Sequence, residues 1–375
     1  MPKIPYLRPR LVPLEEFAGY VRQIEQTRVY SNFGPLNTRF EERIVSEYFG
    51  GAGAATTVNN ATAGLILAIA LAKRPGGRYA VMPSFTFPAT PLAAIWAGLE
   101  PFFVDVSPDD FCLSLTELER TLDELGHSVA VVVPYAAFGY PMDLAPYADL
   151  VKRGVPVVVD AAASFGTSLE GAGFGTNFHG SIVFSFHATK TFGIGEGGLV
   201  YSHDAKFIQR LREAANFGFG PDKISQFCGL NAKLPEIAAA IGLATLERFP
   251  EKKRQRMAVY AWYYHELQRR GLLGRGWIMQ KQLGEIPHVC FPLLCPPGVS
   301  NQGVVRRLAA RGMDLRTYFS PSCHHQPPFR EFKRGTLTET ETLAQRVLSC
   351  PLWEEMSRAQ VSDIVAELQK SVVEQ

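Results

Sequence analysis

Short apolar runs alternate with amphipathic segments over roughly residues 50–205. The runs are rich in β-branched or aromatic residues and do not alternate with polar ones, as is typical of strands covered on both faces. Helical spacing of apolar residues marks the segments Ala61–Ala72 and Leu115–Leu125. This alternation predicts an α/β domain with a mostly parallel sheet flanked by helices. The expected strands are Tyr79–Met82, Pro101–Asp105, Val129–Val133, Val155–Val159, Ser181–Phe186 and Leu199–Tyr201.

The pattern changes in the C-terminal third of the chain. A long connecting helix is expected from about Glu236 to Leu272, with Pro250 as a point where it can break because proline lacks a backbone donor. Beyond it, a strand at His288–Leu294 and helices at 302–311 and 357–373 indicate a smaller α+β domain. We therefore predict a large domain over residues 1–245 and a small C-terminal domain over residues 246–375.

Composition and charge fit a soluble globular enzyme. Hydrophobic residues make up 46% of the 375 residues and charged residues 20%. The 38 basic and 36 acidic side chains nearly cancel, which gives no electrostatic argument for a nucleic-acid or membrane partner. No uninterrupted apolar run in the sequence approaches membrane-spanning length. The N-terminal residues Met1–Pro5 lack the apolar stretch of a signal peptide. We expect a cytoplasmic protein.

The cysteines do not suggest a metal centre or a disulfide framework. No two of the six form a C-x-x-C pair, so they are expected to be mostly reduced core thiols. Cys323, His324 and His325 are adjacent, but three contiguous residues converge poorly on one ion. No metal is expected.

Lys190 ends an apolar strand and is followed by several glycines, an unusual place for a surface charge. A lysine that snorkels from a strand end is one interpretation. The other is an amine kept neutral by partial burial so that it can attack an aldehyde. Ser185 precedes it by five residues and could offer a hydroxyl to a phosphate group.

Three further segments follow or flank predicted strands. Asp160 comes directly after a buried run, where it could cap the next helix or face a protonated ring nitrogen. Asn60 and Thr62 open a helix, which indicates either a plain N-cap or an anion site. Phe87 follows another strand and could stack on a flat ring or belong to the core. The order of these segments, all at strand ends, decides the interpretation.

The chain resembles the DegT/StrS-type sugar aminotransferases, a branch of the fold-type I enzymes that use pyridoxal 5′-phosphate (PLP). So many matches in one order are a specific signal. The matching segments are Ser31–Pro35, Phe40-Glu41, Asn60–Ala63, Pro83–Phe87, Phe103–Val106, Asp160–Ala162, Phe184–Lys190, Gly229–Glu236 and Ala239–Leu243.

The resemblance implies roles for individual residues. Lys190 would hold PLP as a Schiff base, Asp160 would contact its pyridine nitrogen, and Phe87 would stack on its ring. Asn231 matches an asparagine that reaches the phosphate from the partner subunit, which implies a homodimer. The implied phosphate ligands are Ala61, Thr62 and Ser185.

The resemblance is weaker in two places. The family commonly has a glutamine near the cofactor's phenolic oxygen, three residues after the aspartate, where this chain has Ala163. The segment with Arg316, Tyr318 and His324 is similar to the family's segment near the sugar. An arginine there could pair with a carboxylate or a nucleotide phosphate, although a surface loop with a satisfied histidine remains an alternative.

The implied reaction is amino transfer from an amino acid, expected to be glutamate, to a keto-sugar. The expected acceptor is a nucleotide-linked 4-keto or 3-keto hexose in aminosugar or polysaccharide biosynthesis. A PLP-dependent sugar dehydratase is one alternative, but the family's dehydratases carry histidine in place of the lysine or add cysteine clusters. The other is a non-catalytic regulatory protein on the same fold. Intact Lys190, Asp160 and Ser185 favour the transaminase.

Overall fold

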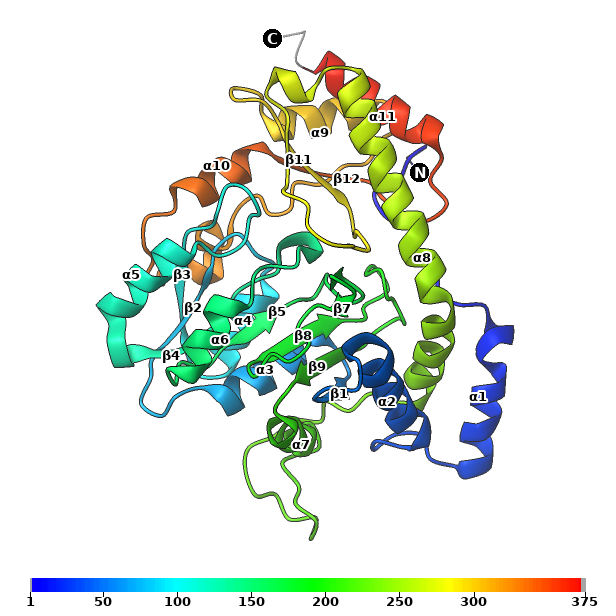
Figure 1. Ribbon diagram of the computed structural model, residues 1–375, viewed down its shortest axis with the longest axis vertical. Helices are drawn as coiled ribbons and strands as arrows, with labels where there is room; N and C mark the ends of the chain where they lie inside the picture. The colour runs from blue at the N-terminus through cyan, green and yellow to red at the C-terminus, as the bar shows by residue number, and fades with distance from the viewer. Residues whose placement is uncertain (1, 372–375) are drawn as a thin grey trace.

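The computed structural model describes residues 2–371 and is built around a central sheet (Figure 1). Two groups of strands, β3-β2-β4 and β5-β8-β9-β1, are joined by parallel bridges from Val132 to Val157 and from Tyr135 to Asp160. Only β9 runs antiparallel to its neighbours in this sheet, so the predicted, mostly parallel α/β architecture is confirmed. The strands are β1 (Ala54–Val58), β2 (Tyr79–Pro83), β3 (Glu100–Val104), β4 (Val129–Val132), β5 (Val158–Asp160), β8 (Ser181–Ser185) and β9 (Gly198–Ser202).

Both faces of the sheet are covered, as the non-alternating runs predicted. Val81 and Phe184 lie in one apolar cluster, whereas Ala80 and Val183 lie in another, so neighbouring residues of one strand face opposite layers. The two helices predicted in this region are confirmed with the same bounds. The helices around the sheet are α2 (Pro35–Phe49), α3 (Ala61–Ala72), α4 (Ala89–Trp96), α5 (Leu115–Leu125), α6 (Ala145–Lys152) and α7 (Ala205–Ala214), and a short hairpin pairs β6 (Ser168–Leu169) with β7 (Ala172–Gly173).

The hydrophobic pattern misplaced some boundaries. It missed β1, whose sequence Ala-Ala-Thr-Thr-Val is short and weakly apolar. It placed a strand at residues 155–159, whereas the corresponding strand β5 begins at Val158 and includes Asp160 as its last residue. The break expected at Pro250 does not occur, because α8 (Glu236–Arg269) is one continuous helix. Tertiary packing on both sides of a long helix offsets the loss of a single backbone donor.

The C-terminal residues form a second layer along α8 (Figure 1). Val259 and Tyr263 of α8 share an apolar cluster with this layer, and so does Ile4 from the N-terminal segment. The division at residue 245 stays a prediction, since α8 spans it. The elements are β10 (Ile278–Met279), β11 (Phe291–Leu294), β12 (Val347–Cys350), α9 (Asn301–Ala310), α10 (Thr338–Arg346) and α11 (Arg358–Lys370), with α1 (Leu14–Thr27) beside α8. The expected end of the last helix, at 373, lies outside the described residues.

No helix among residues 2–371 has the length and apolar character needed to cross a membrane.

A buried carboxylate ties α8 to the start of α2. Glu236 is 1% exposed and accepts the backbone N–H groups of Leu36 and Asn37, at 2.9 and 2.8 Å. These donors belong to the positive end of α2, where a negative charge is favourable. Gly34 makes the contact possible, because a Cβ there would lie 2.7 Å from Glu236 Cδ.

We predict that Glu236→Gln lowers the free energy of unfolding by about 1–3 kcal/mol, because one charge-assisted acceptor is lost from a buried site. Urea denaturation followed by circular dichroism measures the change. Glu247→Gln on the same helix is the matched control, since the Glu247 side chain is 60% exposed and a surface pair contributes little. Equal effects of the two substitutions would show that the buried contact is unimportant.

Candidate active site

Three strand ends meet at one edge of the sheet. Gly198, the first residue of β9, pairs with Val58 at the end of β1 and with Ser185 at the end of β8. One strand further along, Asp160 pairs with Val183. Ligands of parallel sheets collect at the carboxyl ends of the strands, and this edge carries most of the residues that the sequence singled out.

The N-terminus of α3 is packed against this edge. Asn60 caps the helix, because its side chain accepts the Ala63 N–H at 2.9 Å. The N-cap interpretation of Asn60 is therefore correct, and it leaves the N–H groups of Ala61 and Thr62 without an acceptor inside the helix. A Cβ on Gly198 would lie 2.8 Å from Ala61 N. The missing side chain thus forms a cradle between α3 and Ser185, with the geometry that suits a phosphate group.

Asp160 is a buried carboxylate held by hydrogen bonds. It is 2% exposed, and it accepts the Thr90 hydroxyl at 2.6 Å and the Ala162 N–H at 3.1 Å. Burial raises the pKa of Asp160, while these two bonds and the charge of Lys190 act in the opposite direction. A carboxylate with these donors favours a cationic partner that shares its buried environment.

Lys190 sits in a tight turn just after β8. Its backbone N–H donates to the His187 carbonyl at 2.8 Å, and its side chain is partly buried. Burial lowers the pKa of the Lys190 amine, whereas the charges of Asp160 and Cys290 act to raise it. A snorkelling lysine would keep its charge in water, so the lowered pKa of the amine favours the nucleophile interpretation.

Phe87 and Ser185 also follow strands that end at this edge. Phe87 lies just beyond β2 and is 56% exposed, with its ring centroid 6.4 Å from that of Phe319. A large aromatic ring that is open to solvent is available for stacking. Ser185 is 7% exposed, and its hydroxyl accepts the His187 N–H at 3.3 Å, which leaves its own proton for another acceptor.

Asn231 lies on the surface, in a segment that touches the base of α3. The residue is exposed, and its backbone forms a bridge to Asn216. Its neighbour Ala232 accepts the Asn59 N–H at 2.7 Å. Asn231 is therefore a surface residue, next to the backbone contact between Ala232 and Asn59.

Two of the three predicted substrate residues come together. The guanidinium of Arg316 lies 5.8 Å from the ring of Tyr6, and the rings of Tyr6 and Tyr318 meet edge to face at 5.7 Å. Arg316 also pairs with Asp314 at 3.0 Å. The sequence did not indicate Tyr6, because only the tertiary fold brings the N-terminal segment to this loop.

His324 is not part of this group. It is 2% exposed, and its Nδ1 lies 2.7 Å from the hydroxyl of Ser84, which begins the segment that carries Phe87. Cys323 donates its thiol to the Thr86 carbonyl at 3.3 Å. The pair therefore clamps the segment Ser84–Phe87. His324 has hydrogen-bond partners, as the alternative held, but it is buried and does not lie on a surface loop.

His324 and His325 do converge with another residue. Their Nε2 atoms lie 3.4 and 3.6 Å from Glu341 Oε1, and the shorter contact, from His324, is a hydrogen bond. The expectation of no metal stays a prediction.

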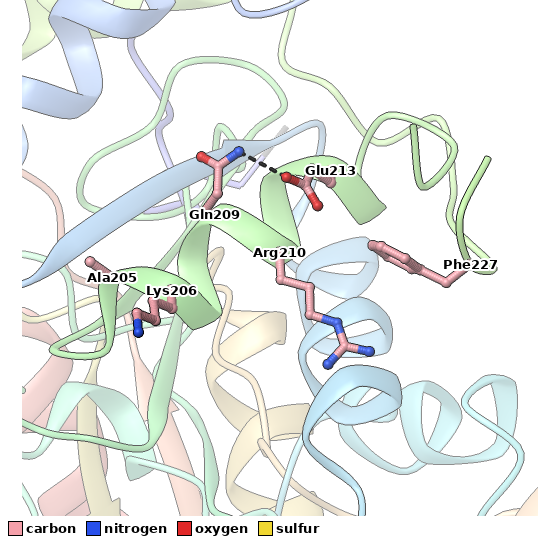
Figure 2. Close-up of a pocket in the computed structure, with 6 residues that line it drawn as sticks. All are labelled: Ala205, Lys206, Gln209, Arg210, Glu213 and Phe227. Atoms are coloured by element: carbon pink, nitrogen blue, oxygen red, sulfur yellow. Dashed lines mark hydrogen bonds between the residues drawn. The ribbon is translucent and has the colours of Figure 1, made fainter. Parts of the chain in front are cut away.

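Other sequence features add no polar group to the site. Ala163, at the position of the family's glutamine, is 4% exposed and offers no side-chain donor. Figure 2 shows a surface pocket on α7, where Arg210 lies over the ring of Phe227 and Gln209 donates to Glu213. None of its lining residues belongs to the set at the sheet edge.

The residues at the sheet edge fit PLP. An aldehyde needs an amine, a pyridinium needs a buried carboxylate, a phosphate needs free N–H groups, and a flat ring needs an open aromatic face. Lys190, Asp160, the α3 cradle and Phe87 supply these four features at the edge where such folds bind ligands. This combination of fold and site defines a fold-type I PLP-dependent enzyme.

The comparisons with known proteins identify the branch. The sequence profile of the DegT/DnrJ/EryC1/StrS aminotransferase family matches residues 14–369, so the chain belongs to this family and is a PLP-dependent aminotransferase. It is 30% identical to protein Rv3402c of Mycobacterium tuberculosis H37Rv, in a match that covers 100% of this chain and 91% of that protein. GDP-perosamine synthase of Caulobacter vibrioides is 28% identical, with 100% and 99% of the two chains covered.

Solved structures agree. A protein of Bacillus cereus ATCC 10987, provisionally assigned as a PLP-dependent aminotransferase, has a TM-score of 0.96 at 48% identity, with 98% and 99% of the chains covered. DesI, solved in the presence of its TDP-sugar product, has a TM-score of 0.89 at 31% identity, with 100% of this chain and 93% of DesI covered.

We predict that Gly198→Ala weakens PLP binding about tenfold or more, because the added Cβ would displace the first turn of α3 and cost at least one charge-assisted contact. Fluorescence titration of the apoenzyme with PLP measures the dissociation constant. Gly19→Ala on α1 is the control, since a Cβ there meets nothing within 4 Å. Unchanged affinity in Gly198→Ala would remove the cradle from the cofactor site.

Proposed function

We propose that this aminotransferase moves an amino group from glutamate to a nucleotide-linked 4-keto or 3-keto hexose. The observation that carries the proposal is the convergence of Lys190, Asp160 and the α3 cradle at one sheet edge. The sugar class rests on relatives: those named GDP-perosamine synthase and dTDP-4-amino-4,6-dideoxy-D-glucose transaminase cover nearly the whole chain. DesI adds a structure with a TDP-sugar product.

In this proposal Lys190 has two duties. Its amine would hold the cofactor through the aldehyde group, and the free amine would take the proton from the donor's Cα. Both duties need a neutral amine, which agrees with the pKa of Lys190 being lowered by burial. PLP, when bound, supplies a protonated ring that withdraws electrons from the donor's Cα. Asp160 holds the proton on the ring nitrogen.

The remaining residues position the reactants. The N–H groups of Ala61 and Thr62, together with the hydroxyls of Thr62 and Ser185, bind the phosphate. Phe87 stacks on the ring with its open face. Arg316 is half exposed beside Tyr318, and its guanidinium suits the diphosphate of a nucleotide-linked sugar.

We also infer a homodimer in which Asn231 reaches the partner's phosphate site. Large apolar side chains around Asn231 are open to solvent: Phe217, Leu230 and Ile237 are 44%, 40% and 45% exposed. Exposed apolar side chains such as these are typical of a protein interface. The symmetry of a dimer would then complete both sites at once.

We predict that the wild-type holoenzyme loses its visible absorbance with glutamate and regains it with a nucleotide-linked keto-hexose. Lys190→Ala should lack the absorbance of the lysine-bound cofactor and lose about 10²–10⁴-fold in turnover, since both the amine and the proton transfer are removed. Spectrophotometry and detection of the aminated sugar nucleotide measure the two effects. Lys206→Ala, an exposed lysine on α7, is the control. Full activity in Lys190→Ala would contradict the proposal.

We predict that two inactive variants, Lys190→Ala and Asn231→Ala, restore activity when their subunits are mixed. A site built from two subunits is intact once in each mixed dimer, because it takes Lys190 from one chain and Asn231 from the other. Random mixing makes about half of the dimers mixed, so about a quarter of wild-type activity should return. If Asn231 instead contributes to the site of its own subunit, no activity should return when the two variants are unfolded and refolded together.

A further inference from the structure

Two buried threonines lead to the carboxylate of Asp160. Thr90, on α4, lies 2.6 Å from Asp160 Oδ2 through its hydroxyl, and the hydroxyl of Thr86 lies 2.9 Å from that of Thr90. Both threonines are 0% exposed. Neither had a role in the sequence analysis: Thr86 belongs to the segment Pro83–Phe87 that resembles the family, and Thr90 lies three residues beyond it.

The direction of these hydrogen bonds follows from the protons available, since each threonine hydroxyl has one and an ionised carboxylate has none. An ionised carboxylate only accepts, so the single hydroxyl proton of Thr90 points to Asp160. Thr90 can then only accept from Thr86, and the Thr86 hydroxyl must donate. The result is a one-way chain, Thr86 to Thr90 to Asp160, in which each bond strengthens the next.

A residue of the C-terminal layer holds this hydrogen-bond chain in place. The Thr86 carbonyl accepts the Cys323 thiol, and the Cys323 N–H donates to the Ser84 carbonyl at 3.0 Å. Thr86 is therefore fixed on the backbone as well as through its hydroxyl. This contact also gives Cys323 a structural role at the site.

We propose that Thr90 is a positioning residue that orients Asp160 and keeps it ionised opposite the cofactor's ring nitrogen. The inference rests on the proposed function, in which Asp160 faces that nitrogen. With Thr90 on Oδ2 and the Ala162 N–H on Oδ1, the carboxylate cannot turn without breaking a bond. Its free lone pairs then point in one fixed direction. The other titratable groups that act on Asp160 are Lys190, after β8, and Tyr135, after β4.

Two substitutions separate the hydroxyl from the shape of the side chain. Thr90→Val keeps the shape and removes the donor, whereas Thr90→Ser keeps the donor and removes a methyl group. We expect Thr90→Val to weaken PLP binding about tenfold, the loss of one hydrogen bond to a charged group. Thr90→Ser should stay within about threefold of wild type, and Thr86→Val should fall between the two.

The pH dependence gives an independent readout. A protonated Asp160 cannot pair with the ring nitrogen, so PLP affinity falls as pH drops through the pKa of Asp160. Removal of the Thr90 donor raises that pKa, because the bond favours the charged form. The fall should therefore begin at a higher pH in Thr90→Val than in wild type or Thr90→Ser. Titration of the apoenzyme with PLP between pH 5 and 9, and the pH dependence of the holoenzyme's visible spectrum, measure it.

A purely structural role predicts the opposite order, with Thr90→Val near wild type and Thr90→Ser weaker because a core methyl group is lost. That order, or an unchanged pH profile in Thr90→Val, would overturn the proposal. If Thr90→Val does not fold, Thr86→Val decides by the same profile, since Thr90 is intact in it. The proposed function fails separately, if wild-type protein does not bind PLP or Asp160→Asn binds it equally well.

Discussion

The buried charge of Asp160 is the constraint around which the site is arranged. A carboxylate that is 2% exposed costs several kcal/mol unless donors and a positive charge surround it. The donors come from α4 and from the turn after β5, and the positive charge comes from the turn after β8. Asp160 therefore ties α4 to the end of β5, which lies 70 residues further along the chain.

Missing side chains matter as much as those that are present. Gly198 lets the first turn of α3 approach the ends of β8 and β9, and Gly34 lets Glu236 reach the first turn of α2. At Gly34, the N-terminus of α2 meets the Glu236 carboxylate; at Gly198, the N-terminus of α3 borders a site for an anion. A Cβ on either glycine would prevent the close approach. The cradle and the anchor of α8 thus use the same physical device. The first is the proposed phosphate site, and the second joins α8 to α2.

The sequence allowed the main residues of the site to be predicted, because each lies within a few residues of a strand end. Asp160, Ser185 and Lys190 follow apolar runs, so their neighbourhood could be inferred from the rule that strand ends share an edge. Thr90, Tyr6 and Glu236 could not be found this way. Their partners lie 70 residues or more away and depend on how the layers pack. His324 shows the converse, since a matching motif did not reveal that its ring is buried against Ser84.

The central claim, that Lys190 is the residue that carries the cofactor, is tested most directly by chemical trapping. Reduction of the PLP-loaded protein with borohydride converts a lysine–cofactor bond into a stable secondary amine, which peptide mass spectrometry can locate. The account predicts a single pyridoxyl phosphate adduct, on the peptide that contains Lys190. An adduct on another lysine, such as Lys233 near the surface, or no adduct on a protein that has bound PLP, would contradict it.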